Sequence, residues 1–179
     1  VALATVVLPR LSVHHAKAEF QAFSKVVDFG LRWVLLIGLP SALGLALLSG
    51  PLLTTLFQSG RFTASDVLNS QSALIAYAPG IIGFMLLKIF SSVYYAKQAI
   101  KTPVRIAMLT VLVNTVLSAL LIGPLQHIGL ALATSLAALF NATFLAILSY
   151  KHRLYQPQLG WLLFLARVLC ALGAMGLFI

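Results

Sequence analysis

Acidic residues are the scarcest feature of this sequence. Only 3 of its 179 residues are Asp or Glu, and charged residues of both signs make up 8% of the chain, whereas a soluble domain carries about 25%. Hydrophobic residues make up 61%. A water-soluble core could not hold this much apolar surface, so lipid is the expected solvent for much of the chain.

The three acids, Glu19, Asp28 and Asp66, all fall where loops or helix ends are expected. A membrane segment without a carboxylate argues against a proton relay built on Asp or Glu. It also argues against an intramembrane aspartyl protease and against a prenyltransferase, which needs acidic clusters to hold metal and diphosphate. With no pairing of a nucleophile and a base in view, we expect no enzyme and no cofactor.

Cysteine and histidine are also sparse. The single cysteine, Cys170, cannot form an internal disulfide. The four histidines lie in expected loops without the helical spacing of metal ligands, so no metal site is expected. The net charge of +9 comes from basic residues placed mostly at helix ends, where they meet anionic headgroups. Membrane lipids rather than nucleic acid are therefore the expected partners.

Long apolar runs are what the sequence has in abundance. A helix needs about 20 apolar residues to cross the hydrocarbon core, which predicts an all-α, polytopic transmembrane bundle of about five membrane helices plus the end of an earlier one. The expected segments are 1–9 (the end of a membrane helix), 10–30 (a cytoplasmic amphipathic connection), 31–57, 70–96, 103–125 and 128–150 (membrane helices) and 161–179 (a truncated membrane helix). Because neither end reads as a natural terminus, we expect an internal piece of a larger transporter.

Basic residues gather on alternate loops, which sets the topology. The loops that hold Lys17, Lys101 and Lys151 carry almost all of them and are expected in the cytoplasm. The loops at 58–69 and 126–127 are then external.

Two cations lie inside apolar segments. Lys88 shares a helical face with Ser91, Ser92 and Tyr95, and Arg167 lies in the last segment. A charge at such depth costs about 2.5 kcal/mol or more, so it should face protein or water. These residues predict a cavity for an anionic substrate such as a phosphate or diphosphate headgroup. The alternative is that each cation snorkels or pairs with carbonyl groups.

A second polar stripe runs along Thr110, Asn114 and Ser118, and the next helix offers Thr134 and Asn141 on one face. Oxygen ligands from two helices could hold a small cation. Without a carboxylate, ordinary hydrogen bonding between helices is the favoured interpretation.

Several short motifs resemble one known family, the MurJ (MviN) lipid II flippases of bacteria. The motifs are Leu39-Pro40-Ser41-Ala42, Leu48-Ser49-Gly50-Pro51-Leu52, the run from Leu56 to Thr63, Tyr94-Tyr95-Ala96-Lys97-Gln98, Lys101-Thr102-Pro103-Val104, and Ile122-Gly123-Pro124-Leu125 with His127 and Gly129. Each motif alone is weak, and together they are specific and cover essentially the whole chain.

The resemblance implies fourteen helices in two lobes, of the type found in multidrug, oligosaccharidyl-lipid and polysaccharide exporters. This chain would form part of the second lobe, with the first lobe of the same protein as its partner. The implied function is transport of lipid II, an undecaprenyl-diphosphate-linked disaccharide pentapeptide, across the cytoplasmic membrane by alternating access. Lys88 would face the central cavity, and the segment 161–179 would contribute to a groove for the lipid tail.

The resemblance also implies a possible sodium site. Some family members bind sodium with an Asn, an Asp four residues later and a Thr on the next helix. Asn114 and Thr134 stand at two of those places, and Ser118 stands where the Asp would be. The loss of the carboxylate makes this a weak site.

Three rival interpretations remain open. The first is a related exporter of other undecaprenyl-linked oligosaccharides or of drugs. The second is a membrane-embedded glycosyl- or acyltransferase, which would need an acidic or histidine site outside this sequence. The third is a purely structural membrane partner, in which Lys88 has no function.

Overall fold

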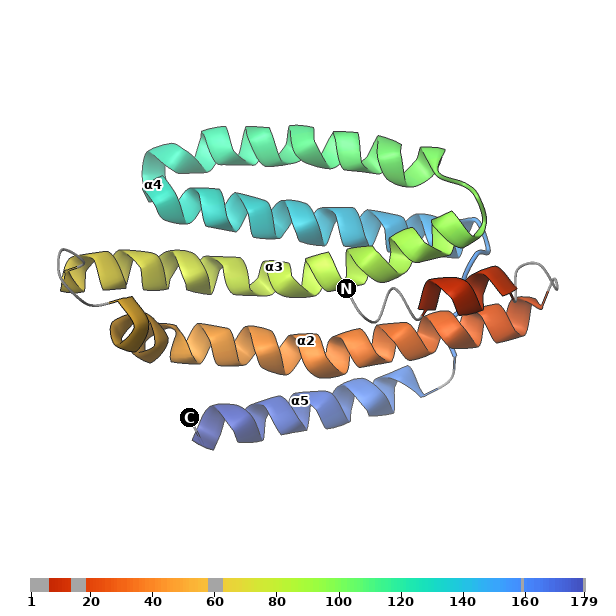
Figure 1. Cartoon of the computed structure of the whole chain (residues 1–179), viewed down its shortest axis with the longest axis horizontal. Helices are drawn as coiled ribbons and strands as arrows, with labels where there is room; N and C mark the ends of the chain where they lie inside the picture. The colour runs from red at the N-terminus through yellow and green to blue at the C-terminus, as the bar shows by residue number, and fades with distance from the viewer. Residues whose placement is uncertain (1–6, 14–18, 58–62, 159, 179) are drawn as a thin grey trace.

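The computed structural model describes residues 7–13, 19–57, 63–158 and 160–178. A short helical segment spans 7–13, and four longer helices follow: α2 (Phe20–Phe57), α3 (Ala64–Ala96), α4 (Lys101–Lys151) and α5 (Trp161–Phe178) (Figure 1). The described residues contain no strand, so the predicted all-α class is confirmed. Lys17 lies outside the described residues, and so do residues 58–62 of the expected external loop.

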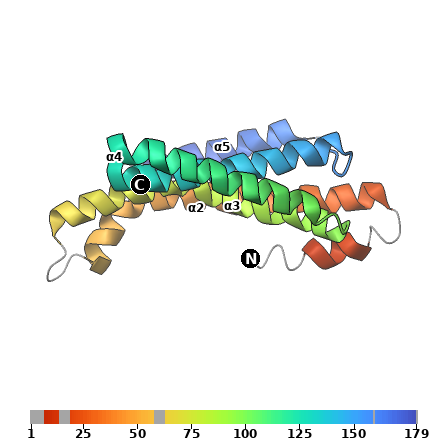
Figure 2. The same ribbon diagram turned by 90° about the horizontal axis from the view of Figure 1, so that it is seen from above.

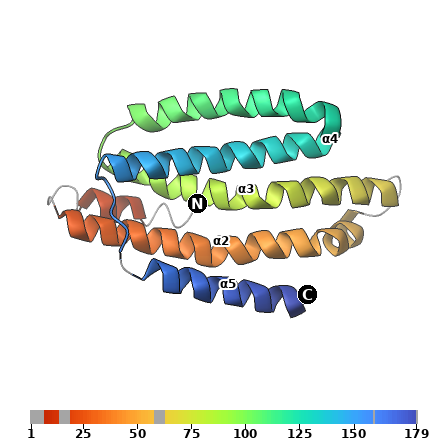
Figure 3. The same ribbon diagram turned by 180° about the vertical axis from the view of Figure 1, so that it is seen from behind.

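The long helices lie side by side in one layer (Figures 1 and 3). α3 packs between α4 and α2, and α5 packs on the other side of α2. Seen from above, the layer is nearly edge-on, and the helical segment 7–13 lies outside it (Figure 2). α2, α3 and α4 are long and apolar enough to cross a membrane, and α5 is a shorter apolar helix.

α4 is a hairpin of two helical halves. Its direction reverses at Gln126, whose φ of 49° and ψ of −126° are not helical. Gly129 lets the second half start close to the first, because a Cβ at that position would overlap the backbone of Leu121. Each half holds about half of the 51 residues of α4, which is about 37 Å of helix at 1.5 Å per residue and enough to span the hydrocarbon core.

The start of α2 corrects one prediction. Residues 20–30, expected as part of a surface connection, are the first turns of a continuous helix from Phe20 to Phe57. Phe23 and Val27 are buried in the hydrophobic core, and Asp28 is buried with them at 4% exposure. Gln21 and Lys25 of this segment are exposed, so it is two-faced as its mixed sequence suggests, and Asp28 lies on the buried face.

α3 also begins earlier than expected, at Ala64 instead of residue 70. The backbone amide of Thr63 donates to the Asp66 carboxylate over 2.8 Å, and a capping box forms at this end of the helix. Thr63 and Asp66 have the residue types and the spacing of a capping box, and the box satisfies backbone groups that the first helical turn leaves unpaired.

α3 and the second half of α4 approach each other closely. A Cβ added at Gly83 would lie 2.8 Å from the carbonyl carbon of Ala138, and one added at Gly80 would lie 2.8 Å from the Ser135 hydroxyl oxygen. The Ser135 hydroxyl donates to the Ala76 carbonyl over 2.7 Å, in the turn before Pro79. A hydroxyl group of a neighbouring helix thus forms a hydrogen bond to the backbone close to Pro79. Such bonds are one way in which a membrane helix tolerates a proline.

Asp28 connects α2 to the segment between α4 and α5. Its carboxylate accepts hydrogen bonds from the Tyr155 hydroxyl at 2.6 Å and from the Trp161 indole nitrogen at 2.7 Å. Arg32, one turn later, forms an ion pair with it at 2.8 Å and lies over the Trp161 ring. Burial raises the pKa of the Tyr155 hydroxyl far above its ordinary value, and the hydrogen bond to Asp28 raises it further. Tyr155 therefore remains a donor at physiological pH.

Gly83→Ala should destabilise the full-length protein by about 1–3 kcal/mol, because the added methyl group has no room against the α4 backbone. Gly173→Ala is the matched control, since a Cβ at Gly173 meets nothing within 4 Å. Thermal unfolding in detergent measures both. Equal melting temperatures for the two variants would contradict the close crossing.

Asp28→Ala should lower the free energy of unfolding by about 2 kcal/mol or more, because it leaves the buried donors of Tyr155 and Trp161 unpaired. Tyr155→Phe removes one donor and should cost less. Proteolysis of the segment between α4 and α5 reports the loss, and Tyr150→Phe, at a side chain that is 65% exposed, is the control. An Asp28→Ala protein as resistant to protease as the wild type would show that the carboxylate does not hold this segment.

Candidate functional site

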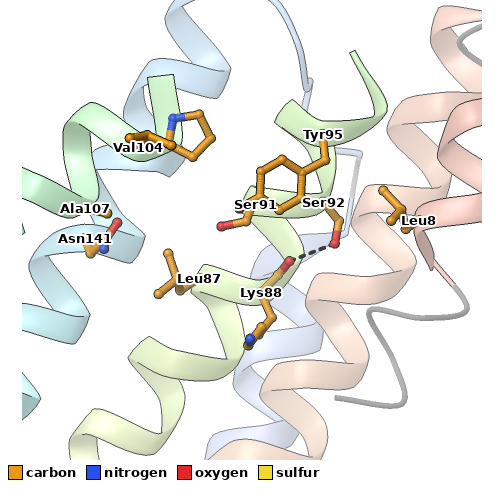
Figure 4. Close-up of a pocket in the computed structure, with 10 residues that line it drawn as sticks. Leu8, Leu87, Lys88, Ser91, Ser92, Tyr95, Val104, Ala107 and Asn141 are labelled. Carbon is orange, nitrogen blue, oxygen red and sulfur yellow. Dashed lines mark hydrogen bonds between the residues drawn. The ribbon is translucent and has the colours of Figure 1, made fainter. Parts of the chain in front are cut away.

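A cavity of about 430 Å³ lies between α3 and α4. Four of the residues predicted to line a substrate cavity, Lys88, Ser91, Ser92 and Tyr95, line it from α3 (Figure 4). Both halves of α4 complete it, together with Leu8 from the first helical segment: Pro103, Val104 and Ala107 come from the first half, and Asn141 comes from the second.

The helical spacing of α3 explains why these side chains meet. Residues three and four positions apart lie on one face of a helix, and residues 88–95 fall entirely within α3. That face turns toward the gap between the two halves of α4, where the opposite wall is formed. The spacing predicts the shared face, whereas only the packing of α4 supplies the opposite wall.

Lys88 provides the positive charge of this cavity. Its side chain is exposed, and it forms no ion pair with any acid of the described residues. The Ser92 hydroxyl is buried and donates to the Lys88 carbonyl over 2.9 Å, within α3. The Ser92 hydroxyl proton is thus bonded within α3, whereas the side chains of Lys88 and Tyr95 are exposed.

Arg167 is not brought to this cavity. It lies exposed on α5, and α5 packs on α2, not on α3 or α4. A role for Arg167 beside Lys88 would therefore need residues or movements beyond those described.

The hydroxyl groups of the second polar stripe bond locally. Ser118 donates to the Asn114 side-chain oxygen over 3.4 Å, and Thr134 donates to the Leu130 carbonyl over 2.9 Å. Among the described residues no group of three or more His, Cys, Asp or Glu could hold a metal ion. A cation site at Asn114, Ser118 and Thr134 stays a prediction.

Asn141 is the residue of the cavity that the sequence placed elsewhere, beside Thr134. It is 5% exposed, and its amide oxygen is buried without a hydrogen-bond partner among the described residues. The single amide side chain in the mostly apolar run 128–150 was the available signal. That Asn141 lines the same cavity as Lys88 depends on how α3 and α4 cross, which the sequence does not show.

Comparison with known proteins identifies the family. The family described as "Lipid II flippase MurJ" matches residues 1–179. The chain is 38% identical over 171 residues to a probable lipid II flippase MurJ of Vibrio cholerae and 39% identical over 171 residues to a lipid II flippase MurJ of Burkholderia cenocepacia. Each match covers 96% of this chain and 33% of the relative, so the chain spans about a third of the length of these relatives.

A solved structure agrees in fold. The structure titled "Lipid II flippase MurJ, inward closed conformation" superposes with a TM-score of 0.83 at 28% sequence identity, over 99% of this chain and 37% of that one. The apolar helices and the family together indicate a multi-pass protein of the bacterial inner membrane. The chain belongs to the MurJ family of lipid II flippases.

Proposed function

We propose that this chain forms part of the second lobe of a transporter that moves lipid II from the inner to the outer leaflet of the cytoplasmic membrane. Its role is transport and not catalysis. The observation that carries the proposal is the cavity between α3 and α4, with Lys88 at its edge, in a chain of the MurJ family. A diphosphate is an anion, and an ammonium group without an acidic partner is a suitable counterion for it.

The placement of Lys88 supports transport over a purely structural role. A lysine within an apolar helix is costly unless it faces water or an anion. Lys88 has no acidic partner among the described residues, so its charge is free to bind a ligand. Arg167 and the weak cation site at Asn114, Ser118 and Thr134 belong to the proposal only as secondary elements, because neither lies in this cavity.

The proposed orientation places the ends of the helices that carry Lys101 and Lys151 in the cytoplasm. The start of α2, the link between α3 and α4, and the link between α4 and α5 lie at one end of the layer (Figure 1). Lys97, Lys101, Lys151 and Arg153 lie in or beside the two links. The turn of α4 lies at the opposite end, and the clustering of basic residues at one end follows the positive-inside rule.

Lys88→Met should lower lipid II flipping by about tenfold or more, because it removes a charge-assisted bond to the diphosphate while keeping the length of the side chain. Lys88→Arg should retain most of the activity. The test uses the full-length gene in bacteria depleted of their own flippase and measures the lipid II that an enzyme added outside can cleave.

Lys151→Met is the matched control, since it removes the same charge from the exposed end of α4 and should leave flipping unchanged. Full activity of Lys88→Met would make Lys88 structural and leave the transport function standing. If the wild type inserts normally and does not restore flipping, the substrate is not lipid II, and a related exporter becomes the better explanation.

Cysteine labelling tests the orientation. In a Cys170→Ala background, Gln126→Cys should react with a membrane-impermeant thiol reagent added to intact spheroplasts, whereas Ala99→Cys, in the link between α3 and α4, should react only after the membrane is opened. The reverse pattern would show that the loop of Lys101 faces outward.

A further inference from the structure

The amide oxygen of Asn141 is a group of the cavity that the diphosphate does not explain. Asn141 is 5% exposed, and this oxygen has no hydrogen-bond partner among the described residues. A buried polar atom without a partner costs free energy comparable to a lost hydrogen bond. An unpaired amide that lines a cavity therefore indicates that a ligand or solvent supplies the missing bond.

The cavity is larger than a site for one water molecule. Its volume is about 430 Å³, whereas a water molecule in the liquid occupies about 30 Å³. This volume lies near the lower end of the range for small-molecule pockets, roughly 300–1,000 Å³. The space suits one ring-sized group, and it is too small for a complete lipid-linked disaccharide pentapeptide.

The polar groups are arranged in two parts (Figure 4). Asn141 lies across the cavity from α3, on the side toward which the Ser91 hydroxyl points, and Val104 and Ala107 also line the cavity from α4. The Lys88 amine extends away from the hydroxyl groups of Ser91 and Tyr95. A neutral, mostly apolar wall with an amide and a hydroxyl thus lies beside a separate positive charge.

The chemistry of the two parts selects different groups. A diphosphate carries only hydrogen-bond acceptors at its oxygens, so it cannot satisfy an amide oxygen. A sugar hydroxyl or an N-acetyl N–H can donate to that oxygen, and sugar hydroxyl oxygens can accept from the amide NH₂ and from Ser91. The apolar wall suits the C–H face of a sugar ring.

We propose that Asn141 is a specificity residue that binds the sugar attached to the diphosphate of a lipid-linked substrate, while Lys88 binds the diphosphate itself. This inference rests on the proposed function, because it assumes a lipid-linked saccharide as substrate. It adds a site for a neutral, polyhydroxylated ring beside the anion site.

Two ligands that share undecaprenyl diphosphate and differ in the disaccharide pentapeptide attached to it test the proposal. The purified full-length protein in nanodiscs is titrated with lipid II and with undecaprenyl diphosphate, which lacks the sugars. Asn141→Leu, which keeps the size of the side chain, should weaken lipid II binding about threefold to tenfold and leave undecaprenyl diphosphate binding within about twofold. Lys88→Met should weaken the binding of both ligands to a similar degree.

Stability without ligand separates this role from a structural one. Because Asn141→Leu removes a buried amide oxygen that has no hydrogen-bond partner, it should leave the melting temperature of the ligand-free protein unchanged or raise it. Thr115→Val is the matched control, since Thr115 is exposed on the same helix and its hydroxyl donates to the Val111 carbonyl. It should alter the binding of neither ligand.

Four outcomes would overturn the inference. Asn141→Leu could weaken both ligands equally, which would place Asn141 in the diphosphate site. Asn141→Leu could weaken the binding of neither ligand. It could also lower the melting temperature sharply, which would make Asn141 a structural residue. A wild type that binds neither ligand would overturn the proposed function, and the sugar site with it, whereas normal wild-type binding with an unaffected Asn141 variant would overturn the sugar site alone.

Discussion

The close approach of α3 to the second half of α4 determines where the cavity lies. Gly83 contacts the backbone at Ala138 and Leu139 without the space for a methyl group. One turn further along each helix, Leu87 and Asn141 become neighbours in the wall of the cavity. A side chain at Gly83 would separate the two helices at this point and move the amide of Asn141 away from the face that carries Lys88. A packing constraint between small residues thus sets the distances on which the polar site depends.

α5 is held by a different kind of interaction. Among the four long helices it packs on α2 alone, and much of its apolar surface is exposed, as at Leu162 and Leu177. Its first residue, Trp161, donates to the buried carboxylate of Asp28. Polar contacts are directional, whereas apolar contacts in lipid give little preference for one helix position over another. Asp28 therefore specifies where α5 begins relative to α2. The free energy of unfolding lost in Asp28→Ala measures how strongly it does so.

Hydropathy and local motifs predict much of this fold. The apolar runs predict the helical bundle, the Thr63–Asp66 pair predicts the cap of α3, and helical spacing predicts the shared face of Lys88 and Tyr95. Asp28 was misplaced because its role depends on Tyr155, which is 127 residues away. When the donors Tyr155 and Trp161 are not known to be near, an acid next to basic and aromatic residues resembles a surface residue. The place of Asn141 in the cavity was not predicted for the same reason, since the opposite wall comes from another helix. Contacts within one helix can be read from spacing, and contacts between distant helices cannot.

The scarcity of acids and the unpaired amide have related consequences for the site. With an acid beside it, Lys88 would be neutralised within the protein, and binding an anion would first require breaking an ion pair. With a hydrogen-bond partner, Asn141 would likewise have to lose one bond before it could form another. Both groups instead reach the cavity without such partners among the described residues, so a ligand can gain each interaction without displacing a protein contact. The cost falls on the empty state, which holds an uncompensated charge and an unsatisfied amide, and a substrate with a neutral part next to an anionic part relieves both.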